Sequence, residues 1–240
     1  MLFFNLDKIH FIQFNNASKC TLVTEIKYED EQISIAKETK FLGLYINNNL
    51  SWKTHIEGIN KLSSACYVMR LVKPYVTTKT LKMIYFSYFH FIITYGLIFW
   101  GNSSDSIKIF RLQKKIIRIL MGCRSRDSCR KLFLDLEILT LHSQYILSLL
   151  LFMIRNKNQF QVNSEIHQIN TRQHANLYQP SVSVTKYQKG VHCIGVKVFN
   201  MLPFYLKAES DNPKKFEAVL QKYLCKNYFY SLDEYFELHS

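Results

Sequence analysis

Two groups of charged residues in this sequence are of types and spacings that could do chemistry. The first consists of three consecutive carboxylates, Glu29–Glu31, set between two short stretches that alternate apolar and polar residues. Carboxylates clustered at a turn between strands can hold the metal ions of phosphoryl transfer. The second group is basic, because residues 101–131 hold nine cations against Asp105 and Asp127 alone. These cations are Lys108, Arg111, Lys114, Lys115, Arg118, Arg124, Arg126, Arg130 and Lys131.

The acidic group does not meet the geometric demands of a metal site. Two-metal catalysis needs carboxylates that converge on ions about 4 Å apart, with support from a neighbouring strand. Consecutive residues of an extended chain point to alternate sides, so Glu29–Glu31 would diverge. The sequence offers no second acidic cluster beside a strand. We therefore interpret these residues as a solvated turn.

The basic group begins on a helix that the sequence predicts over residues 106–121. At 100° per residue, counted from Lys108, the other basic residues of this helix fall between about 240° and 340°, and its apolar residues between about 20° and 200°. Such a basic face is either a solvated surface of a bundle helix or a ridge that follows phosphates. The further cations of residues 122–131 strengthen the second interpretation. The apolar face comprises Ile109, Phe110, Leu112, Ile116, Ile117, Ile119 and Leu120.

The composition indicates a folded, basic, helix-rich protein. The chain has 240 residues, of which 48% are hydrophobic and 15% aromatic, with seven glycines and four prolines. This is enough apolar material for one large domain or two small ones, and it argues against disorder. The formal net charge of +13 would attract phosphates or anionic lipid.

The periodicity of apolar residues predicts an α+β fold that is mostly helical. Short antiparallel strands occupy residues 1–50, a helical bundle residues 51–155, and an irregular extension residues 156–240. Strands are expected at 8–14, 22–28, 32–36 and 41–46, with Glu29–Glu31 as the turn between the second and third. Helices are expected at 52–72, from Thr77 or Thr78 onward, at 106–121, 131–155, 191–202 and 213–226.

Other sites find little support in the sequence. The six cysteines form no CxxC pair, which disfavours zinc and suggests reduced thiols in an intracellular protein. The N-terminus lacks the features of a signal peptide. No nucleophile elbow, Gly-rich phosphate loop or zinc-protease motif is present. The uncharged stretch Met83–Trp100 could span a bilayer, although its polar residues favour a helix buried in a bundle.

Several ordered motifs resemble one polymerase family. The stretch FLGLYINNNLSWKTHI (41–56) is similar to F-L-G-hydrophobic-x-I-D-x-x-L-x-W-x-x-H-I of reverse transcriptases from non-LTR (LINE-type) retrotransposons, especially the jockey-like kind. YFSYFHFIITYGLIFWGN (85–102) resembles that family's Y-x-S-L-x-x-x-x-L-x-Y-G-x-x-x-W-G. The likeness continues, in the family's order, through residues 112–122, 129–146 and 185–207.

This resemblance implies roles for three regions. Asn5 and Lys8 match the family's N-x-x-K-T motif near the incoming nucleotide, with Ile9 in place of the threonine. Phe41, Leu42 and Gly43 match the primer grip, so residues 1–50 would be a remnant of the palm. Residues 51–155 would be the thumb, whose nine cations would hold the backbone of RNA, an RNA–DNA hybrid or DNA. In this family the acidic turn is an ordinary variable turn.

The resemblance also implies that the chain does not polymerise by itself. The family's catalytic aspartates, which bind Mg²⁺, precede the matching region, so we expect a C-terminal fragment with no cofactor of its own. We expect it in the cytoplasm, the nucleus or both, without membrane attachment. Two alternatives stay open: a membrane-associated helical protein, resting on Met83–Trp100, and a scaffold that binds another protein through an exposed apolar face.

Overall fold

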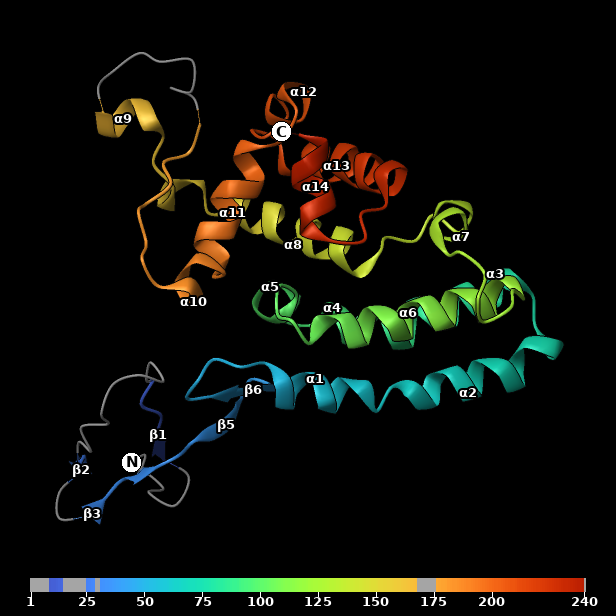
Figure 1. Ribbon diagram of the computed structural model, residues 1–240, viewed down its shortest axis with the longest axis horizontal. Coiled ribbons are helices and arrows are strands. Elements are labelled where there is room, and N and C mark those ends of the chain that lie inside the picture. Colours follow the sequence, from blue (N-terminus) through green and yellow to red (C-terminus); the bar gives the residue numbers. More distant parts are fainter. Residues whose placement is uncertain (1–8, 15–24, 29–30, 168–175, 240) are drawn as a thin grey trace, which may run out of the picture. The chain divides into compact units, whose positions relative to one another are not determined.

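The computed structural model describes residues 9–14, 25–28, 31–167 and 176–239 (Figure 1). The chain forms two compact units, Met1–Ile59 and Asn60–Ser240. The described strands lie in the first unit, and the second is built mainly of helices. This confirms the predicted class, α+β and mostly helical. The assignment of palm, thumb and extension to residues 1–50, 51–155 and 156–240 stays a prediction.

Short strands in three pairs make up the sheet structure of the first unit. β2 and β3 pair antiparallel. The turn predicted at Glu29–Glu31 stays a prediction, because residues 29–30 lie outside the described residues and Glu31 belongs to β3. β1 and β4 pair parallel, contrary to the expectation of antiparallel strands alone. A parallel pair needs a long connection, and residues 12–33 supply it. The strands are β1 (His10–Phe11), β2 (Lys27–Tyr28), β3 (Glu31–Gln32), β4 (Ser34–Ile35), β5 (Glu38–Phe41) and β6 (Leu44–Asn47).

The segment predicted as one strand over 41–46 is instead the end of a β-hairpin. β5 and β6 pair antiparallel, with Phe41 opposite Leu44. The two residues between them have positive φ angles, 45° at Leu42 and 82° at Gly43. Successive positive φ angles define the two-residue turn that best matches strand twist, and glycine adopts them without strain. The run over 41–46 is apolar apart from Gly43, so it was interpreted as one strand although glycine is a residue that turns favour.

After the hairpin the described residues are mainly helical. The helices are α1 (Lys53–Asn60), α2 (Ser63–Val72), the 3₁₀ turn η2 (Lys73–Tyr75), α3 (Thr78–Ile84), the π-helical η3 (Tyr85–His90), α4 (Phe91–Thr94), α5 (Leu97–Trp100), α6 (Ser106–Met121), α7 (Arg130–Asp135), α8 (Leu141–Arg155), η4 (Lys157–Gln159), α9 (Asn163–His167), α10 (Thr185–Gln188), α11 (Val191–Asn200), α12 (Phe204–Lys207), α13 (Pro213–Asn227) and α14 (Leu232–Leu238).

The long uncharged stretch is divided among several short helices. Gly96 has a φ of 60° and ends the helical run that begins at α3, and α5 starts immediately after it. Among the described residues, no helix combines the length and the apolar character that crossing a bilayer requires.

Two other predicted helices are each divided in two. The helix expected over 52–72 is interrupted between α1 and α2, at residues 61–62. The helix expected over 131–155 is interrupted between α7 and α8, where Glu137 has a φ of 51°. Thr140 then caps α8, because its Oγ1 accepts a hydrogen bond of 3.1 Å from the backbone N–H of Ser143. This cap satisfies a backbone donor that a continuous helix would have paired internally.

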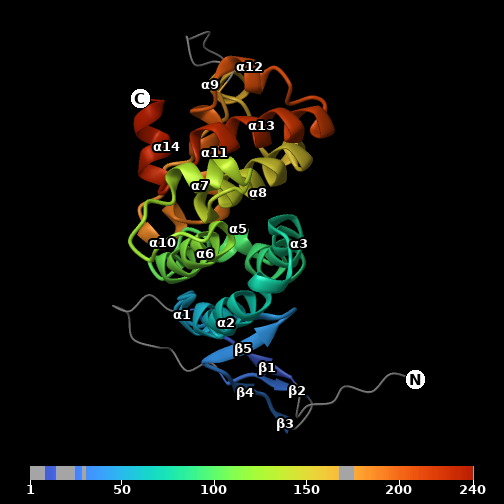
Figure 2. The same ribbon diagram turned by 90° about the vertical axis from the view of Figure 1, so that its right-hand side faces the viewer.

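The core of the second unit is arranged around α8. Its residues are apolar on almost every side, and α11 and α13 pack against it (Figure 2). Gly195 of α11 allows a close approach, because a Cβ atom there would lie 2.5 Å from Sδ of Met153. Beyond residue 190 the extension is largely helical, and the helices predicted over 191–202 and 213–226 correspond to α11 and α13.

Candidate nucleic-acid interface

The predicted basic helix is present with the expected bounds as α6. It ends at Gly122, which has a φ of 72°. The N–H of Cys123 donates to the carbonyl of Arg118 (2.9 Å), and the N–H of Gly122 donates to the carbonyl of Ile119 (3.2 Å). This is the Schellman arrangement, which glycine favours at a helix C-terminus. The helix end, and the loop that follows it, are thereby fixed.

The apolar face of α6 is buried as predicted. All seven predicted side chains are at most 8% exposed. The helix packs against α2, α3, α7 and α8. Burial of a leucine-sized side chain contributes roughly 1.5–3 kcal/mol, so this face fixes the orientation of the helix. The basic residues are consequently turned away from the core.

A buried glutamine that sequence reasoning missed lies within this apolar face. Gln113 is fully buried, and its Nε2 donates to Oη of Tyr85 and to the carbonyl of Leu139, each at 2.9 Å. Its Oε1 accepts a hydrogen bond of 2.8 Å from the N–H of Leu141, at the start of α8. Gln113 thus connects α6 with the segment around Tyr85 and with the beginning of α8. In the helical projection counted from Lys108, Gln113 lies at 140°, among the apolar residues. This position could have identified it as a buried polar residue.

Three of the nine predicted cations are paired with a carboxylate or an aromatic ring. Lys108 forms an ion pair of 2.7 Å with Asp105. The Nζ of Lys114 lies 4.7 Å from the ring centroid of Phe110, an attractive cation–π distance. Arg130 forms an ion pair with Glu234. For Lys108, Lys114 and Arg130 the role in nucleic-acid binding stays a prediction, and these partners would compete with it.

The other predicted cations present charge to solvent. Arg118 is half-buried, and its Nε donates to the carbonyl of Asp127 at 2.8 Å. Arg111 and Lys115 lie four residues apart on α6, so they occupy the same stripe as Arg118. Among the described residues, no carboxylate lies within ion-pair distance of Arg111 or Lys115. The exposed cations are Arg111, Lys115, Arg124, Arg126 and Lys131.

A tenth cation, which sequence reasoning missed, faces the end of α6. Arg70 of α2 lines a cavity of about 340 Å³ together with Lys115 and Arg118. Burial raises the pKa of the Cys66 thiol, whereas the charges of Lys115 and Arg70 act in the opposite direction. Both cations therefore lie near the same point between α2 and α6. Arg70 follows the buried residue Met69 on α2, so its place beside the apolar stripe could have been recognised.

The residues matched to the polymerase's primer region fall in the first unit. Phe41, Leu42 and Gly43 form the tip of the β5–β6 hairpin, where the side chains of Phe41 and Leu42 are exposed. Asn5 and Lys8 lie outside the described residues. A primer-grip role for the hairpin tip stays a prediction.

The acidic turn is described only at its edge. Glu31 pairs with Tyr28 in the β2–β3 ladder, whereas Glu29 and Asp30 lie outside the described residues. Within the described ranges, no three His, Cys, Asp or Glu side chains gather in a way that could hold a metal ion.

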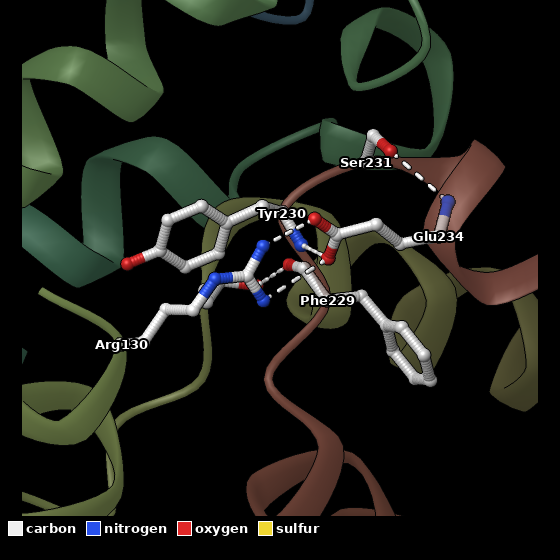
Figure 3. Close-up of polar contacts among 6 residues, drawn as sticks. Arg130, Phe229, Tyr230, Ser231 and Glu234 are labelled. Carbon is white, nitrogen blue, oxygen red and sulfur yellow. Dashed lines mark hydrogen bonds and ion pairs between the residues drawn. The ribbon is translucent and has the colours of Figure 1, made fainter. Parts of the chain in front are cut away.

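The C-terminal segment is attached to α7 through Arg130 (Figure 3). Glu234 accepts hydrogen bonds from the Arg130 guanidinium and, at 2.8 Å, from the N–H of Tyr230. The guanidinium carbon also lies 4.3 Å from the ring centroid of Tyr230. Burial acts to raise the pKa of Glu234, but the hydrogen bonds from Arg130 and Tyr230 outweigh it, and the pKa lies below its ordinary value of 4.5.

The lowered pKa of Glu234 predicts a pH-dependent contribution to stability. A carboxyl whose pKa is depressed by folding stabilises the protein above its ordinary pKa and loses that effect as the pH falls through the folded value. Glu234→Gln should therefore lower the free energy of unfolding by about 1 kcal/mol near neutral pH, a modest effect because the pair is partly exposed. Below about pH 4 the difference from wild type should shrink, as measured by urea denaturation.

The neighbouring acidic residue on α14 provides the control. Glu237 is exposed on the same helix, so Glu237→Gln should leave the unfolding free energy within about 0.5 kcal/mol of wild type at every pH. Equal effects of the two substitutions would contradict the assigned role of Glu234.

No known protein family, curated protein or solved structure matches this chain. The resemblance to a non-LTR reverse transcriptase rests on the sequence motifs alone.

Proposed function

We propose that this protein binds the sugar–phosphate backbone of RNA or of an RNA–DNA hybrid, without reading its sequence. The observation that carries the proposal is the arrangement of α6, whose apolar face is buried while Arg111, Lys115 and the loop cations Arg124 and Arg126 stay exposed. We call Arg111, Lys115, Arg118, Arg124 and Arg126 the cationic strip. Cations on a fixed support position a nucleic acid through its phosphates.

The strip has the charge and the support that such binding requires. The Schellman turn at Gly122 and the hydrogen bond from Arg118 to Asp127 hold the loop cations next to the helix cations. The formal net charge of +13 adds long-range attraction for a polyanion. Exposed arginines donate in a planar fork that suits phosphate oxygens.

The motif resemblance extends this proposal to a class of polymerase. A thumb that follows the catalytic aspartates of a non-LTR reverse transcriptase would hold the template–primer duplex by its backbone. The matching motifs at 85–102 and 112–122 include the larger part of α6 and Tyr85, which accepts a hydrogen bond from Gln113 of that helix. We propose that the chain is this part of such a polymerase, which contributes binding and not the metal-dependent chemistry.

The salt dependence of binding tests the proposed function. Each phosphate that a cation neutralises releases counterions, so the slope of log affinity against log salt should be roughly −3 to −4 for four or five contacts. Raising the salt from about 50 to 200 mM should then weaken binding to an RNA–DNA hybrid by roughly a hundredfold. Fluorescence anisotropy with two hybrids of unrelated sequence should give the same slope. An affinity that is independent of salt, or a strong preference for one sequence, would contradict the proposal.

A further inference from the structure

The cavity beside the cationic strip brings three cations toward one point. Arg70 comes from α2, whereas Lys115 and Arg118 come from successive turns of α6. Ser125, Ile119 and Cys123 complete the lining, and no carboxylate occurs among the described residues that line the cavity. The site is a positively charged concavity with an additional hydroxyl donor.

The wall of this cavity is fixed by hydrogen bonds on two sides. The Nε of Arg118 donates to the carbonyl of Asp127 at 2.8 Å, which directs the guanidinium and leaves its two NH₂ groups for a ligand. The carboxylate of Asp127 accepts a hydrogen bond of 2.7 Å from the N–H of Arg124, so it is engaged with the loop backbone. The loop that carries Ser125 is thereby held against the end of α6.

The helix dipole opposes an anion at this position, but the local cations outweigh it. The C-terminus of a helix carries the equivalent of about half a negative charge. Lys73 offsets this charge because its Nζ donates to the carbonyl of Ile119 at 2.7 Å. Arg70, Lys115 and Arg118 then remain to balance a ligand. The net local charge favours an anion that carries more than one negative charge.

Convergence distinguishes this cavity from the rest of the strip. Cations that follow a backbone are spread out, and each meets a phosphodiester of one negative charge. Here three cations line a single concavity, and a phosphate monoester carries about −1.5 to −2 charges at pH 7. A volume of about 340 Å³ lies within the range of small-molecule sites and admits a phosphate with its attached sugar.

We propose that the cavity of Arg70, Lys115, Arg118 and Ser125 binds a phosphate dianion, either the terminal monoester of a strand or free inorganic phosphate. In its strand-end form this proposal rests on the proposed function, because a strand lying on the cationic strip would place its terminus here. Lys115 and Arg118 would then serve both the strip and the cavity, whereas Arg70 and Ser125 would serve the cavity alone.

The first test compares two RNA–DNA hybrids that differ only in a 5′-phosphate or a 5′-hydroxyl on the RNA strand. The full-length protein should bind the phosphorylated hybrid about tenfold more tightly, an amount typical of one or two charge-assisted contacts. Arg70→Ala should abolish the preference, and Ser125→Ala should reduce it severalfold. Both residues are exposed, so neither substitution should unfold the protein. Arg111→Ala should weaken both hybrids equally and leave the preference unchanged.

A second test uses inorganic phosphate and pyrophosphate in the absence of nucleic acid. The melting temperatures of wild type and of Arg70→Ala are measured with and without each anion. Stabilisation of wild type alone would support the cavity even if no hybrid bound, and in that case the proposed function would fail independently. Equal affinity for the two hybrids, together with no stabilisation by either anion, would overturn the proposal. A 5′-phosphate preference that survives in Arg70→Ala would overturn it as well.

Discussion

Reversing the charge of both Arg111 and Lys115 is expected to lower the affinity for an RNA–DNA hybrid by about a hundredfold at moderate salt. These two side chains are exposed on one stripe of α6. Among the described residues, no carboxylate lies within ion-pair distance of either one. Replacing them with glutamate removes two phosphate contacts and adds repulsion. A hundredfold change corresponds to about 2.8 kcal/mol of binding free energy. The slope of log affinity against log salt should become less negative by about 2.

The matched control changes the same amount of charge elsewhere in the second unit. Lys214 and Lys222 are exposed on α13, so Lys214→Glu with Lys222→Glu alters the net charge equally. This variant should lose no more than about threefold in affinity, which reflects only the long-range field. Fluorescence anisotropy on hybrids of several sequences should show the same loss for each sequence. Equal losses for the two variants would indicate diffuse attraction and would contradict a localised strip.

Replacing Gln113 by leucine is expected to destabilise the second unit by about 3–5 kcal/mol. The substitution removes two donors and one acceptor from a fully buried position. The hydroxyl of Tyr85, the carbonyl of Leu139 and the N–H of Leu141 would then lack these partners. A buried polar group left unsatisfied costs about 1–3 kcal/mol, and a domain is stable by only about 5–15 kcal/mol in total. Urea denaturation measures this loss.

A surface substitution and a double-mutant cycle complete that experiment. Gln221 is exposed on α13, so Gln221→Leu should change the free energy of unfolding by less than about 0.5 kcal/mol. Tyr85→Phe should cost less in the Gln113→Leu background than in wild type, because their shared hydrogen bond is already absent. Additive effects, or a loss of less than about 1 kcal/mol in Gln113→Leu, would contradict the network described for Gln113.

The structure of α6 could be predicted from the sequence because local signals agree there. The 3.6-residue period runs through the whole segment, and Gly122 follows its last apolar turn. The helical period and the residue that ends the helix are both local properties of the sequence, so no distant contact is needed to fix them. The separation of buried and basic faces followed directly.

Other features depended on contacts that the sequence pattern does not show. The turn at Leu42 and Gly43 lies within a mostly apolar run, and the break before Thr140 lies within a run that continues to look helical. In both places the backbone changes direction while the neighbouring residues stay mostly apolar. Tertiary packing, and not local propensity, decides such positions.

The sequence was enough to predict which basic residues belong to the candidate site. It was not enough to predict which of them are paired within the protein. The spacing of basic residues indicated a cationic helix face, and it identified Arg111 and Lys115 correctly as solvent-facing. It could not show that Arg130 pairs with Glu234, because the two are 104 residues apart. Nor did it bring Arg70 to the end of α6, since that depends on the packing of α2 against α6.

Lysine footprinting tests most directly whether the strip is where nucleic acid binds. Acylation of exposed amines is compared with and without a saturating RNA–DNA hybrid, and the modified lysines are identified by mass spectrometry. Lys115 should be protected by the hybrid, whereas the exposed lysines of α13, Lys214 and Lys222, should react at unchanged rates. Protection of Lys214 and Lys222 with continued reaction at Lys115 would show that nucleic acid binds elsewhere.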